Sequence, residues 1–153
     1  MTMKYIWILI MAAGLALTTV ACAADTLADI AIVRADNTQI RFSVELALDA
    51  DAQEQGLMYR TDLAENHGML FIYKKAMPRY FWMKNTLIPL DIIFFGRKNE
   101  IIFIGNNAKP ESLDIVGPKG QDVCTVLEIG GGEAKRLGLA IGDRLIAQLP
   151  DCK

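Results

Sequence analysis

The feature that most constrains the fold is the succession of short apolar runs along the chain, each closed by turn-forming residues. Some runs alternate apolar and polar residues, as residues 39–46 do, which is typical of a half-buried strand. Others, such as residues 91–95, are apolar almost throughout and indicate a buried strand. The expected strands are residues 27–35, 39–46, 69–73, 80–83, 91–95, 100–104, 122–129 and 143–148.

Two segments lose the period of two and are expected to form short helices. Asp49 or Asp51 is expected to cap the first helix, within residues 49–59, and Gly56 limits its length. The second helix, within residues 133–137, is stopped by Gly138. We therefore expect a mainly β (α+β) fold, a compact barrel-like sheet of seven or eight short strands with two short helices at its rim.

Residues 1–24 have the order of a secretory signal peptide. A short positive region ending at Lys4 precedes an apolar run at residues 5–20, and small residues follow at 21–24. The apolar run is shorter than the roughly 20 residues of a membrane span, so we favour cleavage and export over an uncleaved anchor helix. Residues 25–153 then form a single domain, which we expect in the periplasm.

Cys22 offers a second interpretation of the same segment. Residues 18–22 loosely resemble a bacterial lipoprotein cleavage site, although Thr19 stands where such sites usually carry Leu. A lipid on Cys22 would anchor the domain to a membrane surface without a spanning helix. Membrane association is expected only through such a lipid.

Cys124 and Cys152 remain as an even pair if Cys22 is removed or lipidated. Oxidising compartments favour pairing of such cysteines, so we expect a Cys124–Cys152 disulfide that fixes the C-terminal tail to a late strand. The alternative is two free thiols. No metal-binding Cys/His spacing is present, and His67 alone cannot form a zinc site.

The charge of the chain argues against a nucleic-acid partner. The sequence has 16 basic and 18 acidic residues; Lys4 is the only charged residue of the leader, so 15 basic and 18 acidic residues remain after cleavage, a net charge of −3. These charges are interspersed along the chain. Nothing in this pattern forms the positive face that nucleic-acid binding requires.

A set of motifs resembles the bacterial and archaeal family called domain of unknown function 192. The resemblance covers residues 30–148 and implies a small β-rich, barrel-like fold with short helices, but no activity. His67 departs from the family pattern, since related sequences more often carry an acid there, which argues against a catalytic histidine. The matching motifs are QGLMYR at 55–60, HGMLFIY at 67–73, FWMKNTLIPLDIIF at 81–94, AKP at 108–110, VLEIGGG at 126–132 and GD at 142–143.

Acidic residues next to or inside apolar strands are the best candidates for a site. Asp91 begins one such strand and Glu128 lies inside another, so each needs a partner or a shifted pKa. Arg60 is the expected partner, because a guanidinium binds a carboxylate through two parallel hydrogen bonds. The result is either a buried ion pair or the charged wall of a ligand pocket. The candidate ligand-binding residues are Arg60, Trp82, Lys84, Asn85, Thr86, Asp91 and Glu128.

Ordinary structural roles stay open for several of these residues. Asn85 and Thr86 suit a turn held by side-chain-to-backbone bonds, and Trp82 suits a half-buried position at the rim of the sheet.

Two further functions stay open. Asp91 and Glu128 would serve as the acid and base of a hydrolase of envelope polymers if they faced one cavity. Met58, Met69 and Met83 would suit Cu(I) in an exported protein, because soft thioethers select that ion, although core filling is the ordinary use of Met.

No other catalytic set can be assembled from the sequence. The chain has one histidine and two serines, Ser43 and Ser112. The glycines at 130–132 lack the Lys-Ser/Thr of a phosphate-binding loop, and tight packing of a strand against a helix explains them better. The sequence therefore favours a non-enzymatic binding or accessory module, without a cofactor, for a small polar ligand or a cell-envelope component.

Overall fold

The computed structural model describes residues 27–150 and 152–153. The signal peptide expected at residues 1–24 and the lipid site expected at Cys22 lie outside this range. No helix in the described part of the chain is long and apolar enough to cross a bilayer. The elements are β1 (Leu27–Val33), β2 (Gln39–Ala47), α1 (Ala50–Gln55), β3 (His67–Met77), β4 (Leu90–Phe95), β5 (Ile101–Ala108), β6 (Val123–Gly130), α2 (Glu133–Arg136) and β7 (Arg144–Ile146).

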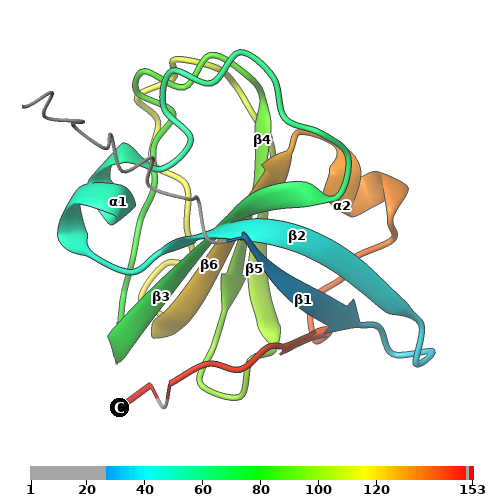
Figure 1. The fold of residues 1–153 in the computed structure, drawn as a ribbon. Coiled ribbons are helices and arrows are strands. Elements are labelled where there is room, and N and C mark those ends of the chain that lie inside the picture. The colour runs from blue at the N-terminus through cyan, green and yellow to red at the C-terminus, as the bar shows by residue number, and fades with distance from the viewer. Residues whose placement is uncertain (1–26, 151) are drawn as a thin grey trace, which may run out of the picture.

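The strands form one sheet in the order β5-β4-β6-β3-β2-β1-β7 (Figure 1). Within this sheet β2 and β3 are parallel, and the other neighbouring pairs are antiparallel. Parallel neighbours need a long crossover, and the chain between Ala47 and His67, which contains α1, supplies it. The mainly β fold with two short helices, predicted from the spacing of apolar runs, is confirmed.

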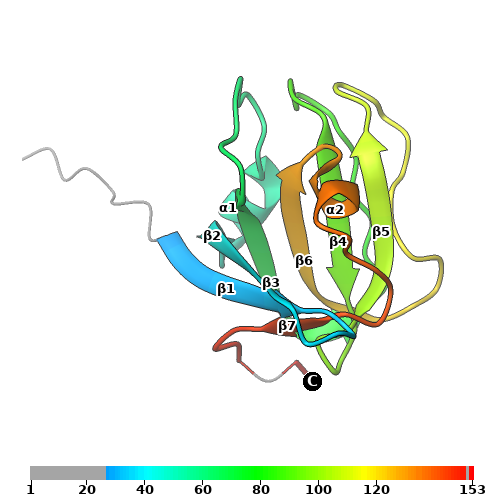
Figure 2. The ribbon, with the colours of Figure 1, turned by 90° about the vertical axis from the view of Figure 1, so that its right-hand side faces the viewer.

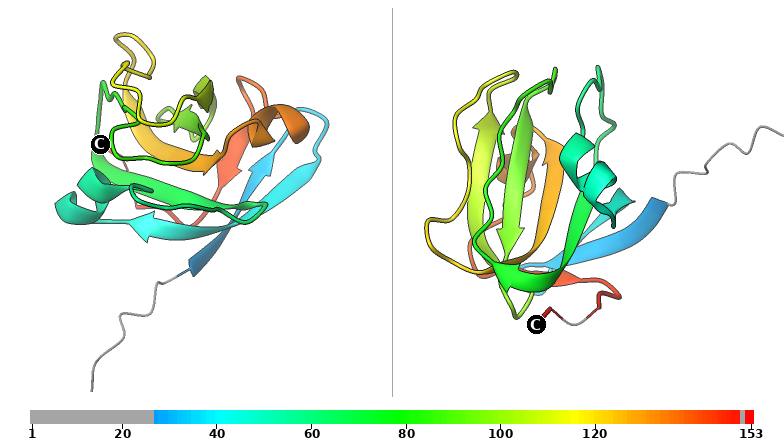
Figure 3. Two further views of the ribbon diagram at one scale, coloured as in Figure 1. Left: turned by 90° about the horizontal axis from the view of Figure 1, so that it is seen from above. Right: turned by 90° about the vertical axis from the view of Figure 1, so that its left-hand side faces the viewer.

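The sheet curls into a half-barrel, which Figure 3 shows from two further sides. Its two edge strands meet at one end, where Glu100 forms an isolated antiparallel bridge with Arg144 and the Ile101 N–H donates to the Asp143 carbonyl oxygen at 2.8 Å. The expected barrel-like sheet is therefore a half-barrel whose edges are joined at that end.

One face of the sheet, the α2 face, packs against α2 and the chain that follows it (Figure 2). Ile93 of β4 and Leu127 of β6 lie on this face, and Ala134 and Leu139 belong to the same buried cluster. Because side chains alternate along a strand, the neighbouring residues of β4 and β6 point to the opposite side.

The opposite side, the α1 face, carries a second buried cluster. Ile92 and Val126 lie there, covered by Leu57 after α1 and by Met83 from the segment before β4. Both faces of β4 and β6 are therefore buried, which explains why β4 is apolar at almost every position.

Helix α1 begins where the first of the two expected caps stands. The Asp49 side chain accepts a hydrogen bond from the Ala52 N–H at 2.9 Å, so Asp49 and not Asp51 is the cap. The Gln53 amide donates to the carbonyl oxygen atoms of Ala47 and Ile72, both at 3.1 Å. These bonds hold α1 against the ends of β2 and the middle of β3.

Strand β3 is longer than the sequence predicted. A loop was expected from residue 74, but the strand continues to Met77. The C-terminal residue supplies the reason, because the Lys153 N–H donates to the Lys74 oxygen at 3.2 Å and the Ala76 N–H donates to the Lys153 oxygen at 2.8 Å. This pairing joins residues far apart in the sequence, so local patterns could not predict it.

Three other boundaries also differ from the sequence-based expectation. Residues 80–83 do not form a strand and contribute only an isolated bridge between Phe81 and Val116. Strand β5 extends to Ala108, into a stretch expected to be loop, and β7 is shorter than expected.

The Cys124–Cys152 disulfide is present, with the two Cα atoms 5.8 Å apart. It joins β6 to the C-terminal tail, as expected. The tail is thereby bonded covalently to one central strand and through hydrogen bonds to β3.

Asp91, near the start of β4, is fully buried and accepts three main-chain hydrogen bonds. Its Oδ1 atom accepts from the N–H groups of Asn107 at 2.6 Å and Gly132 at 3.0 Å, and its Oδ2 atom accepts from Ala134 at 2.7 Å. One side chain of β4 thus fixes the end of β5 and the first turn of α2.

Gly131 allows this arrangement because the main chain passes very close to its neighbours. A Cβ atom at this position would lie 2.6 Å from the Asn107 side-chain oxygen and 2.8 Å from the Pro89 Cβ. Of the three glycines, Gly131 is thus the one that close packing requires, and its close neighbours are Pro89 and Asn107 rather than a helix.

We expect Asp91→Asn to lower the free energy of unfolding by about 2–4 kcal/mol, because the amide cannot accept the bonds on both oxygen positions and leaves buried N–H groups unpaired. Urea denaturation measures this change. Asp114→Asn, at an exposed carboxylate, is the matched control and should leave stability nearly unchanged. Equal effects of the two substitutions would contradict the structural role of Asp91.

Reduction of the disulfide should lower the free energy of unfolding by about 3–4 kcal/mol, since the bond closes a loop with a sequence separation of 28. Urea denaturation with and without reductant measures the difference. A Cys124→Ser/Cys152→Ser double variant should be insensitive to the reductant. An unchanged midpoint in the wild-type protein would argue against a stabilising bond.

Candidate functional site

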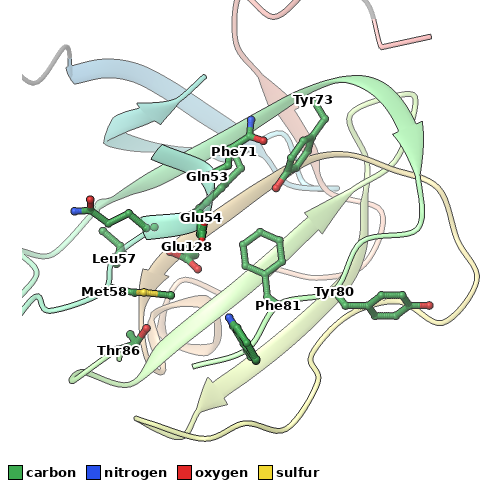
Figure 4. Close-up of a pocket in the computed structure, with 13 residues that line it drawn as sticks. Gln53, Glu54, Leu57, Met58, Phe71, Tyr73, Tyr80, Phe81, Thr86 and Glu128 are labelled. Atoms are coloured by element: carbon green, nitrogen blue, oxygen red, sulfur yellow. The ribbon is translucent and has the colours of Figure 1, made fainter. Parts of the chain in front are cut away.

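A pocket of about 170 Å³ opens on the α1 face between α1, β3, β6 and the segment after β3 (Figure 4). We call it the Glu128 pocket, after the buried acid among its lining residues. Its principal walls are Gly56, Phe71, Tyr73, Phe81, Trp82 and Thr86.

Glu128 provides a buried carboxyl group in this pocket. The residue is 5% exposed, and its Oε2 atom has no hydrogen-bond partner among the described residues. Burial raises the pKa of Glu128 from 4.5 to about 8, while the backbone N–H of Leu57 lowers it in part. The carboxyl is therefore largely protonated at neutral pH and can both donate and accept a hydrogen bond.

The alternation of β6 places Glu128 on the α1 face, where it is paired with Ile92 of β4. Above it the chain turns at Gly56, which has a φ of 49°. A Cβ atom at Gly56 would lie 3.4 Å from Glu128 Oε2 and 3.2 Å from the Phe71 ring. A glycine here lets the main chain pass over the carboxyl without filling the space beside it.

Phenylalanine rings form one side of the pocket. The rings of Phe71 and Phe81 meet edge to face with their centroids 5.0 Å apart, and Phe81 meets Phe94 in the same way at 5.6 Å. Such contacts favour one orientation of each ring. Figure 4 shows the Phe81 ring near Glu128, whereas the Tyr80 ring points away.

Tyr73 lies further along β3, near Arg79 and Glu128. The pKa of Tyr73 is raised to about 12, chiefly by burial; Arg79 opposes this increase and Glu128 adds to it. The Arg79 guanidinium carbon lies 3.4 Å from the centroid of the Tyr73 ring, a cation–π contact. The Tyr73 hydroxyl therefore stays protonated at physiological pH.

Main-chain hydrogen bonds position the segment that carries Phe81, Trp82 and Thr86. The Met83 N–H donates to the Ser112 oxygen at 2.9 Å, and Phe81 is bridged to Val116. These bonds place the aromatic residues over β3 and β6, although no regular strand forms.

Of the seven candidate residues, Trp82, Thr86 and Glu128 line the pocket. Arg60 does not pair with either expected carboxylate. Its Nη2 atom lies 2.5 Å from Oε2 of Glu45, and the Arg60 side chain is 41% exposed. The expected buried pair is thus a partly exposed ion pair with a residue of β2.

Lys84 and Asn85 have local roles outside the pocket. The Lys84 ammonium lies 5.2 Å from the centroid of the Trp82 ring. The Asn85 amide donates to the Tyr59 hydroxyl at 2.9 Å, and the Tyr59 N–H donates to the Asn85 oxygen at 2.8 Å. Asn85 therefore joins two loops. The side-chain-to-backbone bond left open for this turn is made by Thr86, whose hydroxyl donates to the Lys84 oxygen at 3.4 Å.

Asp91 and Glu128 lie on opposite faces of the sheet. Asp91 of β4 stands opposite Ile129 of β6, and the next residue of β4, Ile92, stands opposite Glu128. Because one step along a strand reverses the side-chain direction, the two carboxyls cannot face one cavity. The acid–base pair expected for a hydrolase is therefore not assembled.

The three methionines considered for copper lie in two different environments. Met69 and Met83 belong to the buried apolar cluster of the α1 face. Met58 lines the pocket, with its sulfur 3.9 Å from the Asn85 amide nitrogen. Core packing accounts for Met69 and Met83. Within residues 27–150 and 152–153, no three His, Cys, Asp or Glu side chains cluster as metal ligands would.

Sequence reasoning missed Gly56, Phe71, Tyr73 and Phe81 as pocket residues. A usable signal was present for two of them, because the period of two in β3 places Phe71 and Tyr73 on one face. Their proximity to Glu128 depends on the pairing of β3 with β6, in which Met69 stands opposite Glu128.

The fold and the pocket define a small β half-barrel domain with a cavity over a buried acid. The model of the DUF192 family, described as "Uncharacterized ACR", matches residues 31–147. This chain belongs to the DUF192 family.

Two solved structures support the assignment. A protein of unknown function from Novosphingobium aromaticivorans is 36% identical, with a TM-score of 0.75 over 79% of this chain and 85% of that one. A protein from Sinorhizobium meliloti, described as a candidate transcription regulator, is 42% identical, with a TM-score of 0.74 over 77% of this chain and 91% of that one. No curated protein matches the chain.

The raised pKa of Glu128 predicts a pH-dependent stability. Between about pH 4.5 and pH 8 the unfolded chain has lost this proton and the folded protein keeps it, so the free energy of unfolding falls by a few kcal/mol as pH rises through this window. Below it both states are protonated. Urea denaturation at several pH values should show this fall in the wild-type protein and a weaker one in Glu128→Gln. If the free energy of unfolding depended on pH in the same way in both proteins, the raised pKa of Glu128 would be contradicted.

Proposed function

We propose that this protein is a non-enzymatic binding module for a small polar ligand, which it recognises in the Glu128 pocket. The observation that carries the proposal is a buried carboxyl with one unpaired oxygen beside a cavity. An unpaired buried polar group costs about 1–3 kcal/mol. Groups with such a cost and a shifted pKa concentrate at functional sites.

Another buried acid gives a useful comparison. Glu133 Oε2 also lacks a partner, but its Oε1 atom accepts from the Asn66 N–H at 3.1 Å and from Arg136 at 2.8 Å. Those bonds give Glu133 a structural role at the start of α2. Glu128 has no comparable side-chain partner in the described part of the chain, and its free oxygen adjoins a cavity.

The size of the cavity limits what it can hold. About 170 Å³ is well below the roughly 300–1,000 Å³ typical of sites for drug-sized ligands. We therefore propose a ligand of a few non-hydrogen atoms, or one chemical group of a larger cell-envelope component.

We further propose that the protein acts outside the cytoplasm. The signal-peptide pattern at residues 1–24 supports export. The Cys124–Cys152 disulfide supports an oxidising compartment such as the periplasm. Attachment to a membrane is proposed only through a lipid on Cys22.

A nucleic-acid partner is not proposed, although the Sinorhizobium meliloti protein is described as a candidate transcription regulator. The chain is net negative at −2. Four of its arginines form ion pairs with acids, which further weakens any positive face. The pairs are Arg34–Asp36, Arg60–Glu45, Arg97–Asp122 and Arg136–Glu133.

Nuclear magnetic resonance of the ¹⁵N-labelled protein tests this function. Titration with n-butanol, propionamide, butyrate and propylammonium should shift the amide signals of Gly56 and Leu57 and the indole signal of Trp82. Trp82→Ala should weaken binding, because it removes an exposed wall of the pocket, and Leu113→Ala, exposed elsewhere, should not. Shifts that avoid the pocket signals, or no shifts with any probe, would refute the proposal.

A further inference from the structure

We infer that the Glu128 pocket selects a primary ammonium group, carried by a small alkylamine or by the end of a longer amine. The inference rests on the proposed binding function and names the class of ligand. Three properties of the pocket support it: the sign of its charge, the chemistry of its walls and the donors and acceptors inside it.

The charge of the pocket is complementary to a cation. Two carboxyl side chains line it, Glu54 from α1 and Glu128 from β6, and none of the lining residues is Lys, Arg or His. An anionic ligand would meet two acids and no base. A cationic ligand would meet a carboxyl group, that of Glu128, with which no basic side chain lining the pocket competes.

The walls of the pocket favour a cation over a neutral polar group. Phe71, Tyr73, Phe81 and Trp82 line the pocket, and the faces of aromatic rings attract positive charge. Two of these rings already make such contacts with the chain's own cations, Arg79 over Tyr73 and Lys84 near Trp82.

The polar atoms of the pocket suit a primary ammonium in particular. Such a group has three N–H donors and no acceptor. Oε2 of Glu128 is an unused acceptor, and the Thr86 hydroxyl, 4% exposed, is a second oxygen among the lining residues. A quaternary ammonium has no N–H donor and would leave Oε2 of Glu128 unpaired.

Binding of an ammonium must displace the proton of Glu128. The free carboxyl is protonated at neutral pH because burial raises its pKa to about 8. On binding, Glu128 releases its proton to solvent and its carboxylate pairs with the ammonium, which keeps all of its own protons. The proton and the ammonium therefore compete for one carboxylate, and affinity rises with pH up to about 8.

Other charged groups near Glu128 do not change the sign of this dependence. Glu54 on α1 adds negative charge, and Tyr73 on β3 stays neutral because its pKa is about 12. Arg79 and Lys84, from the chain after β3, are the nearby cations, and neither lines the pocket. Alkylamines themselves lose their proton only near pH 10.

The test compares propylammonium with n-butanol, a neutral probe of similar size, by titration of the full chain at several pH values. We expect propylammonium to bind more tightly, and its dissociation constant to fall by about tenfold per pH unit up to about pH 8. Glu128→Gln should lose both the preference and the pH dependence. Trp82→Ala should weaken binding, and Leu113→Ala should behave as wild type.

The outcomes separate this inference from the proposed function. If n-butanol binds as well as propylammonium, the cation selectivity is refuted. The same holds if the binding of propylammonium weakens as pH rises towards 8. In either case the pocket is a site for neutral ligands and the proposed binding function stands. Tighter binding of tetramethylammonium would refute the choice of a primary ammonium. If no probe shifts the pocket signals, both proposals are refuted. The wild-type pH series remains decisive even if Glu128→Gln does not fold.

Discussion

The arrangement of this domain depends on the carboxylate of Asp91. Its three main-chain hydrogen bonds join β4, in the interior of the sheet, to the end of β5 and to the first turn of α2. They act together with the packing of Ala134 and Leu139 to hold α2 on the sheet. Gly131 completes the arrangement, because only a residue without a side chain lets Pro89 and Asn107 approach so closely.

Two buried acids on neighbouring strands illustrate how differently a sheet can use the same chemical group. Asp91 is fully bonded and stabilises the fold, whereas Glu128, across the sheet, has one unpaired oxygen and opposes folding at neutral pH. The difference follows from what covers each face: backbone donors of α2 on one side, and aromatic rings with an intervening cavity on the other.

Much of the fold could be predicted from the sequence, because strands, turns and helix caps are recorded in local patterns. The mixture of strands and short helices was predicted in this way. The Cys124–Cys152 bond was predicted instead from the even pair of cysteines and the expected oxidising compartment. The partner of Arg60 could not be, since Glu45 is reached only after the crossover brings β2 beside β3. The placement of Asp91 and Glu128 on opposite faces could not be predicted either, because it depends on the register in which β4 pairs with β6.

The turn at Gly56 has a consequence for the comparison of related chains. Its missing side chain leaves room between the main chain, Phe71 and Glu128, at a backbone conformation that other residues rarely adopt. A side chain at this position would strain the turn and place its first atom against the Phe71 ring and Oε2 of Glu128. In a related chain, a glycine at the equivalent position is therefore a sign that the space beside the buried carboxyl is open.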